Sequence, residues 1–200
     1  MADFMRDLPL SWHDQPDESD VTSDWRNAAA DVIGRAAVLL ETADIGEATR
    51  EFLATDFARA MRSRRFRAAP DQLDGSPESM RALAQETRTG RTTSVRVLAR
   101  AVAAYLELAR ELDAVADLPP RSSGAVALYL AAKAPTPIRA VISGHTLRAR
   151  DAGWAFGRGP LLEDDAVPLL EFLLGRSERA PAPPAAGPAD DSGPSLGPGA

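Results

Sequence analysis

The stretch VISGHTLRARDAGWAFGRGP, residues 141–160, decides whether this chain is entirely helical or mixed. Polar and apolar residues alternate along HTLRAR (145–150), and the two large side chains of WAF (154–156) share one face, which is typical of strands. The intervening DAG (151–153) suits a hairpin loop that a glycine closes in the left-handed conformation. The sequence therefore predicts a β-hairpin in this stretch.

The residues on either side extend this hairpin into a small module. In IRAVIS (138–143) every second residue is apolar, which predicts a third strand. After the hairpin, Asp164 or Asp165 is expected to cap a leucine-rich helix that ends at Gly175. We therefore expect a module of three short strands and one helix over residues 136–176, packed on the preceding part of the chain.

The glycine-rich end of the stretch, GRGP (157–160), raises the alternative of a phosphate-binding loop. A dinucleotide-binding loop needs the pattern G-x-G-x-x-G, which opens directly into a helix after a strand. Here Pro160 follows the second glycine, and the apolar pair Leu161 and Leu162 comes next. We therefore expect turns at these glycines and no phosphate-binding loop.

Upstream of the module, apolar residues recur at the spacing of amphipathic helices. Five segments carry such a stripe: residues 25–40, 45–61, 77–84, 95–115 and 123–130. Pro119 and Pro120 end the fourth stripe, and Ser123 is the predicted cap of the fifth. The chain is therefore expected to be α+β and mostly α, with a helical bundle over residues 23–135 followed by the module of strands and helix.

The two ends of the chain differ in composition from this body. Residues 1–24 hold seven acids and one base, so residues 1–22 are expected to form an acidic, flexible arm. Phe4 and Trp12 are among the apolar residues interleaved there, so the arm could instead dock on a partner or on this protein's own surface. Residues 177–200 are rich in Pro, Ala, Gly and Ser, which predicts a disordered tail.

The content of cysteine and histidine excludes several kinds of site. The chain has no cysteine, which rules out disulfides, thiolate nucleophiles and Cys-ligated metal centres. Catalytic zinc takes three protein ligands of His or carboxylate type, and the two histidines of the chain, His13 and His145, are far apart in sequence. We therefore expect no bound metal, no cofactor and no catalytic residue. His145 could act as a general base, but Ser143 and Thr146 beside it lack the sequence context of a nucleophile.

One basic cluster, RAMRSRRFR (59–67), could bind the phosphates of a nucleic acid. Its five arginines are accompanied by Phe66, which could stack on a base, and the hairpin arginines, among them Arg158, could extend the patch. The body of the chain is neutral, however, and no known nucleic-acid-binding motif accompanies the cluster. Cations at the end of a helix also complement the helix dipole, so nucleic-acid binding is possible but not favoured.

Trp154 is open to two interpretations. Because Trp154 and Phe156 share one face of their strand, both rings are expected to pack against the helix that carries Leu169, Leu170 and Leu173. If the indole is exposed instead, it marks a surface for a binding partner.

Residues 123–176 present a helix, the hairpin LRARDAGWAFGRGP, an acidic turn and the leucine-rich AVPLLEFLLGR in this order. In this order they resemble the C-terminal part of the mycothiol-dependent maleylpyruvate isomerase family. The resemblance implies an N-terminal four-helix bundle in front of a small C-terminal domain. Members of that family hold a zinc ion through histidines of the bundle, whereas the expected bundle helices of this chain contain none. No zinc ligand or catalytic residue is therefore carried over.

These observations favour a non-catalytic cytoplasmic protein that binds a protein partner or a small ligand in the crevice where the hairpin meets the bundle. The chain contains no run of eighteen apolar residues, so we expect no membrane-spanning helix. The N-terminal stretch does not have the pattern of a leader. The acidic arm and the hairpin are the expected partner-binding elements. The alternatives are an isomerase or transferase of the resembling family and a nucleic-acid-binding regulator. The candidate binding surface consists of Arg59, Arg62, Arg64, Arg65, Arg67, His145 and Trp154.

Overall fold

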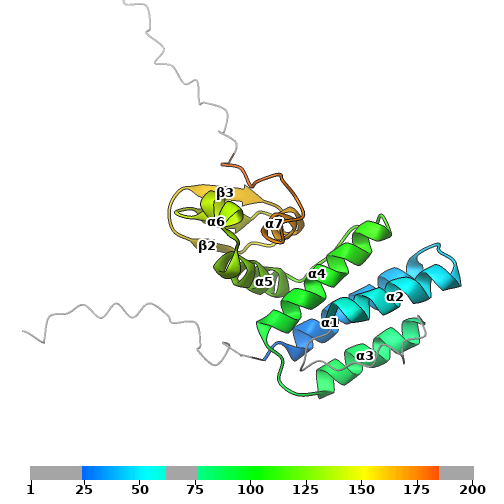
Figure 1. Cartoon of the computed structure of the whole chain (residues 1–200). Coiled ribbons are helices and arrows are strands. Elements are labelled where there is room, and N and C mark those ends of the chain that lie inside the picture. Colours follow the sequence, from blue (N-terminus) through cyan, green and yellow to red (C-terminus); the bar gives the residue numbers. More distant parts are fainter. Residues whose placement is uncertain (1–23, 62–75, 185–200) are drawn as a thin grey trace, which may run out of the picture.

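The computed structural model describes residues 24–61 and 76–184 of the chain, so the predicted arm at residues 1–22 lies outside the described residues. The described residues form seven helices and three strands, which are shown in Figure 1. This arrangement confirms the predicted α+β fold, which is mostly helical. In chain order the elements are α1 (Arg26–Thr42), α2 (Glu47–Met61), α3 (Pro77–Thr89), α4 (Val95–Glu111), α5 (Pro120–Lys133), α6 (Thr136–Ile142), β1 (Thr146–Ala149), β2 (Ala155–Gly157), β3 (Leu161–Asp164) and α7 (Ala166–Leu173).

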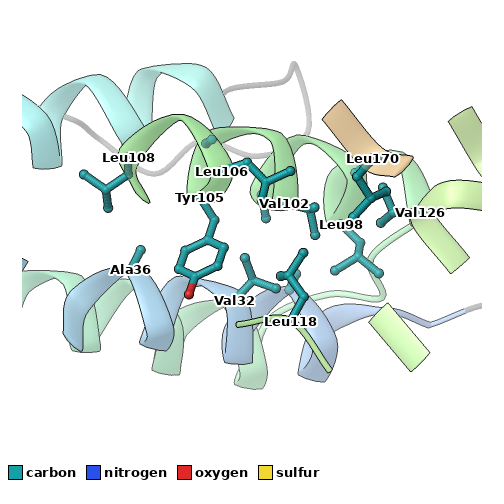
Figure 2. Packing of buried hydrophobic residues seen from close by; sticks show 14 of the residues in the cluster. Val32, Ala36, Leu98, Val102, Tyr105, Leu106, Leu108, Leu118, Val126 and Leu170 are labelled. Carbon is teal, nitrogen blue, oxygen red and sulfur yellow. The ribbon is translucent and has the colours of Figure 1, made fainter. Parts of the chain in front are cut away.

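Helix α4 is central to the bundle, because it packs against α1, α2 and α5. Leu98 and Tyr105 lie on its buried stripe and are 0% and 2% exposed. Figure 2 shows the Tyr105 ring pointing from α4 toward α1, which carries Val32 and Ala36. The Tyr105 hydroxyl accepts a hydrogen bond of 3.2 Å from the backbone N–H of Asp117, so the polar end of this buried ring is satisfied.

Residues 138–143 do not form the predicted strand, because Thr136–Ile142 are the short helix α6. Pro137 lies in the first turn of this helix, where the missing backbone N–H leaves no hydrogen bond unmade. Ile138 and Ile142 are four residues apart, so the same apolar pattern also fits one face of a helix. The strand prediction was wrong because the pattern satisfies both periods.

The sheet contains β1 at its centre, in the order β2-β1-β3. The predicted hairpin is confirmed by the antiparallel pairing of β1 with β2 and by Gly153, whose φ of +68° is left-handed. Strand β3, which supplies the third strand, runs parallel to β1. Because Gly157 of β2 and Leu161 of β3 both pair with Thr146, the short connection over residues 158–160 crosses the start of β1.

Helix α7 has Asp165 at its N-cap position, but the side chain of Asp165 makes no capping hydrogen bond. The acceptor is Asp151 in the hairpin loop, whose Oδ1 accepts a bond of 2.7 Å from the backbone N–H of Ala166. The other predicted cap, Asp164, lies in β3, 3.3 Å from the guanidinium of Arg150. The sequence placed Asp165 correctly at the N-cap position, but the carboxylate that accepts the hydrogen bond comes from Asp151 in a different element.

The chain after α7 returns to the sheet, which corrects the predicted start of the tail. Ala182 forms an antiparallel bridge with Glu163 of β3, in which the backbone N–H of Glu163 donates to the carbonyl of Ala182 at 2.7 Å. Pro181 beside it is buried. Backbone pairing at a sheet edge needs no apolar side-chain pattern, so composition could not reveal it. Residues 177–184 thus belong to the fold, and residues 185–200 lie outside the described part.

One continuous hydrophobic cluster joins the helical bundle to the module of strands and helix. Leu98 of α4, Val126 of α5 and Leu170 of α7 are fully buried and lie close together in Figure 2. Helix α5 packs against both α4 and α7 and so connects the two parts. No single described helix is long and apolar enough to cross a membrane, and α5 and α6 reach that length only as a pair bent by 114°.

Candidate functional site

A pocket of about 350 Å³ opens where the sheet meets α5 and α6, and we call it the hairpin pocket. The sequence predicts ligand binding where the hairpin meets the bundle, and the pocket borders the bundle at Ala131 of α5. Small-molecule sites in proteins have volumes of roughly 300 to 1,000 Å³, so this volume suits a small ligand. The lining residues are Ala131, Ile142, Gly144, His145, Leu147, Phe156, Gly157 and Arg158.

Two glycines allow the chain to cross tightly at one end of the hairpin pocket. Gly157 and Gly159 have φ angles of +108° and +114°, which residues with a side chain rarely adopt. A Cβ at Gly157 would overlap the carbonyl oxygen of His145, and a Cβ at Gly159 would overlap that of Gly144. The connection from β2 to β3 can therefore pass directly against the start of β1, and Arg158 between the two glycines is held close to His145.

The apolar part of the lining is fixed by packing. Leu147 of β1 is 2% exposed, and Phe156 of β2 stacks on Trp154 with the ring centroids 5.6 Å apart. The Trp154 indole in turn donates a hydrogen bond of 3.0 Å to the hydroxyl of Ser123 in α5. This series of contacts from α5 to the sheet holds the Phe156 ring in its position at the pocket.

His145 is the first of two polar side chains in the lining. It is half-buried, and its Nδ1 lies 3.1 Å from the carbonyl oxygen of Ser143. Because a carbonyl oxygen can only accept, Nδ1 carries a proton in this hydrogen bond. With Nδ1 as the donor, Nε2 of a neutral ring is left as a hydrogen-bond acceptor.

Arg158 is the second polar side chain, and it brings a permanent positive charge to the pocket. Its side chain is exposed, and it forms no ion pair with another described residue. None of the described lining residues is acidic. The hairpin pocket therefore presents an uncompensated positive charge beside apolar surface.

The structure describes three residues of the predicted binding surface, Arg59, His145 and Trp154. Arg59 lies on α2 and forms an ion pair of 3.5 Å with Asp56. His145 lines the hairpin pocket, whereas Trp154 is not among its lining residues and supports the ring of Phe156. The remaining arginines of the basic cluster lie outside the described residues: Arg62, Arg64, Arg65 and Arg67.

Trp154 packs against more than the predicted helix. The half-buried indole contacts the cluster that contains Leu169 of α7, as predicted, and it also lies against Gly124 of α5. Ser123, the predicted cap of α5, is instead fully buried in a helix that begins at Pro120, and its hydroxyl receives the indole N–H. The cap prediction was wrong because Pro120 already begins the helix three residues earlier.

A second hollow, of about 370 Å³, lies between α2 and α4. Arg176, which follows α7 and lines this hollow, donates to the carbonyl of Ala103 at 2.9 Å and forms an ion pair of 3.4 Å with Glu107. These contacts tie the end of α7 to α4. The charge of Arg176 is thus compensated by a carboxylate of the protein, unlike the charge of Arg158 in the hairpin pocket.

The hydroxyl beside the hairpin pocket is engaged with the backbone. The part of the chain that the structure describes contains no group of three or more His, Cys, Asp or Glu side chains placed to hold a metal ion. Thr146, the hydroxyl residue next to His145, donates from Oγ1 to the carbonyl of Gly159 at 3.1 Å. The hydroxyl is therefore engaged with the backbone and is not paired with the imidazole.

Most of the lining could not be identified from the sequence. Ala131, Ile142, Leu147 and Phe156 come from four different elements that only the fold brings together. The local signal for this site was the spacing of Gly157 and Gly159, which the sequence assigned to turns. Comparisons of the chain with protein-family models, with curated proteins and with solved structures give no match.

Proposed function

We propose that this protein binds a small, largely apolar molecule in the hairpin pocket and does not transform it. The observation that carries the proposal is a pocket whose apolar side chains, Ile142, Leu147 and Phe156, adjoin the two polar residues His145 and Arg158. Burial of apolar surface supplies most of the binding free energy in such sites, and a few polar groups orient the ligand.

The polar contacts around the pocket support binding in preference to catalysis. A nucleophile that is activated by a general base needs a hydrogen bond between the two side chains. His145 is oriented by a backbone carbonyl, and the Thr146 hydroxyl bonds to the carbonyl of Gly159. Neither contact prepares a proton transfer between the two side chains.

A simple probe for this function is 3-phenylpropan-1-ol, because its ring and chain match the apolar lining and its hydroxyl is neutral. If each of its roughly ten non-hydrogen atoms contributes a binding free energy of about −0.4 kcal/mol, its dissociation constant should be on the order of 1 mM. Ligand-observed NMR on the full chain measures affinities of this size.

A substitution that fills the pocket tests the location of binding. Ala131→Trp places a large ring among the lining residues, whereas Ala132→Trp adds the same ring at the next position of α5, which is exposed and does not line the pocket. We expect saturable binding by the native chain and by Ala132→Trp, and an affinity about tenfold lower for Ala131→Trp. Equal binding by all three chains, or no binding by the native chain at several millimolar probe, would overturn the proposal.

A further inference from the structure

The contacts of the arginines in the C-terminal part indicate which kind of ligand the hairpin pocket binds. Among the described residues from Thr136 onward, every arginine except Arg158 either forms an ion pair with a carboxylate or donates a side-chain hydrogen bond to a backbone carbonyl. The engaged arginines are Arg139, Arg148, Arg150, Arg176 and Arg179. Arg148, for example, donates from Nε to the Glu163 carboxylate on the neighbouring strand at 3.0 Å. Arg158 is thus set apart in a region that otherwise compensates its charges.

Arg158 also has a defined place beside the pocket. Arg158 follows Gly157, the residue of β2 that pairs with Thr146, and the backbone at Gly157 lies against that of His145. His145 and Arg158 both line the pocket, so two nitrogen-bearing side chains border its apolar surface.

We propose that the ligand of the hairpin pocket carries a carboxylate, which the guanidinium of Arg158 binds. This inference rests on the proposed function, because it names the chemical class of the ligand for the same site. A guanidinium matches a carboxylate with two parallel hydrogen bonds. The apolar part of the ligand then packs on Ile142, Leu147 and Phe156.

The charge of the lining also says which ligands the pocket disfavours. None of the described lining residues is acidic, so a cationic group would lie near the Arg158 charge without a compensating carboxylate. A neutral molecule would bury apolar surface but leave the guanidinium unpaired. An apolar molecule with one carboxylate satisfies both parts of the lining.

Three probes with the same ring and chain test the charge alone: 3-phenylpropionate, 3-phenylpropan-1-ol and 3-phenylpropylamine. Their dissociation constants are measured by NMR titration of the full chain, and the three probes differ only in the group at the end of the alkyl chain. We expect the carboxylate to bind about tenfold more tightly than the alcohol, and the amine to bind more weakly than the alcohol.

Two variants assign this preference to one residue. Arg158→Gln should lower the affinity for the carboxylate about tenfold and leave the affinity for the alcohol unchanged. Arg91→Gln makes the same change of net charge at an exposed arginine that does not line the pocket, and it should leave all three constants unchanged. Unchanged binding of the alcohol shows that the pocket of the Arg158 variant is intact.

The two proposals fail in different ways. If the carboxylate and the alcohol bind the native chain equally well, or if Arg158→Gln keeps the preference, the ligand class is wrong although binding in the pocket stands. Tightest binding of the amine overturns the ligand class as well. If none of the three probes binds, the proposed function is wrong, and the inference about its ligand falls with it.

Discussion

The indole N–H of Trp154 donates a hydrogen bond of 3.0 Å to the hydroxyl of Ser123, which fastens the hairpin to helix α5. The Ser123 hydroxyl donates in turn to the carbonyl of Pro120 at 3.1 Å. Because Ser123 is fully buried, this polar contact lies inside an otherwise apolar junction. The ring that supports Phe156 at the pocket is therefore itself held in place by a helix.

Trp154→Ala should lower the free energy of unfolding by about 3 kcal/mol, because it removes a large ring from this junction. Trp154→Phe keeps an aromatic ring but leaves the Ser123 hydroxyl without its donor, and it should cost about 1 kcal/mol. Urea unfolding of the native chain and both variants measures the two effects. An unchanged midpoint for Trp154→Ala would show that the ring does not hold the hairpin to α5.

Gly159→Ala should destabilise the protein by roughly 3 kcal/mol or more, because its φ of +114° is strained for alanine and the added Cβ would overlap the carbonyl of Gly144. Gly34→Ala is the matched control. Gly34 lies within α1, and a Cβ there meets no described atom within 4 Å, so alanine should stabilise the helix by roughly 0.5–1 kcal/mol. Thermal unfolding measures both variants, and similar shifts for the two would count against the tight crossing at the pocket.

Asp24 links the stability of the bundle to pH. Its Oδ1 accepts hydrogen bonds from the backbone N–H of Thr93 at 3.0 Å and of Arg26 at 3.1 Å. The bond from Thr93, followed by the bond from Arg26 and its charge, lowers the pKa of Asp24 below the ordinary value of 3.8. A carboxyl whose pKa is lowered on folding stabilises the protein above its unfolded pKa, and this contribution is lost as the pH falls through the folded pKa.

Asp24→Asn should therefore be less stable than the native chain at neutral pH, and the difference should shrink as the pH falls below about 4. Urea midpoints of both chains, measured from about pH 7 down to about pH 3, follow this difference. A gap that stays constant over the whole range would contradict the role of the ionised carboxylate.

A chain that ends at Pro184 should be more stable than a chain that ends at Arg176, by about 1–2 kcal/mol, because only the longer chain keeps the bridge between Ala182 and Glu163. The shorter chain also exposes the edge of β3, which favours association between copies. Urea unfolding compares the stabilities, and sedimentation detects association. Equal stability of the two chains would show that the segment after α7 adds nothing to the sheet.

The sequence predicted the helices whose apolar residues recur at helical spacing, because one face of such a helix is buried. It also predicted the turn at Gly153 from its residue types, and the structure contains both the helices and the turn. The prediction failed at residues 138–143, whose apolar positions fit the periods of a strand and of a helix alike. It also missed the acceptor at the N-terminus of α7, because Asp151, which caps this helix, lies in another element.

The hairpin pocket could be predicted only as a crevice, because its walls come from α5, α6, β1 and β2. That Arg158 has no ion-pair partner among the described residues emerges only after the neighbouring carboxylates have been placed, since arginines look alike in the sequence. His145 was a candidate from its chemistry, and the structure brings it close to Arg158 through the crossing at Gly157 and Gly159.

Methyl NMR tests most directly whether the hairpin pocket binds a small ligand. Titration of the full chain, labelled at the methyl groups of Ile and Leu, with 3-phenylpropionate should shift the signals of Ile142 and Leu147 to saturation. The signals of Leu53 and Leu108, which line the hollow between α2 and α4, should stay in place. Saturable shifts at Leu53 and Leu108 without shifts at Ile142 and Leu147, or no saturable shift at all, would contradict a binding role for the hairpin pocket.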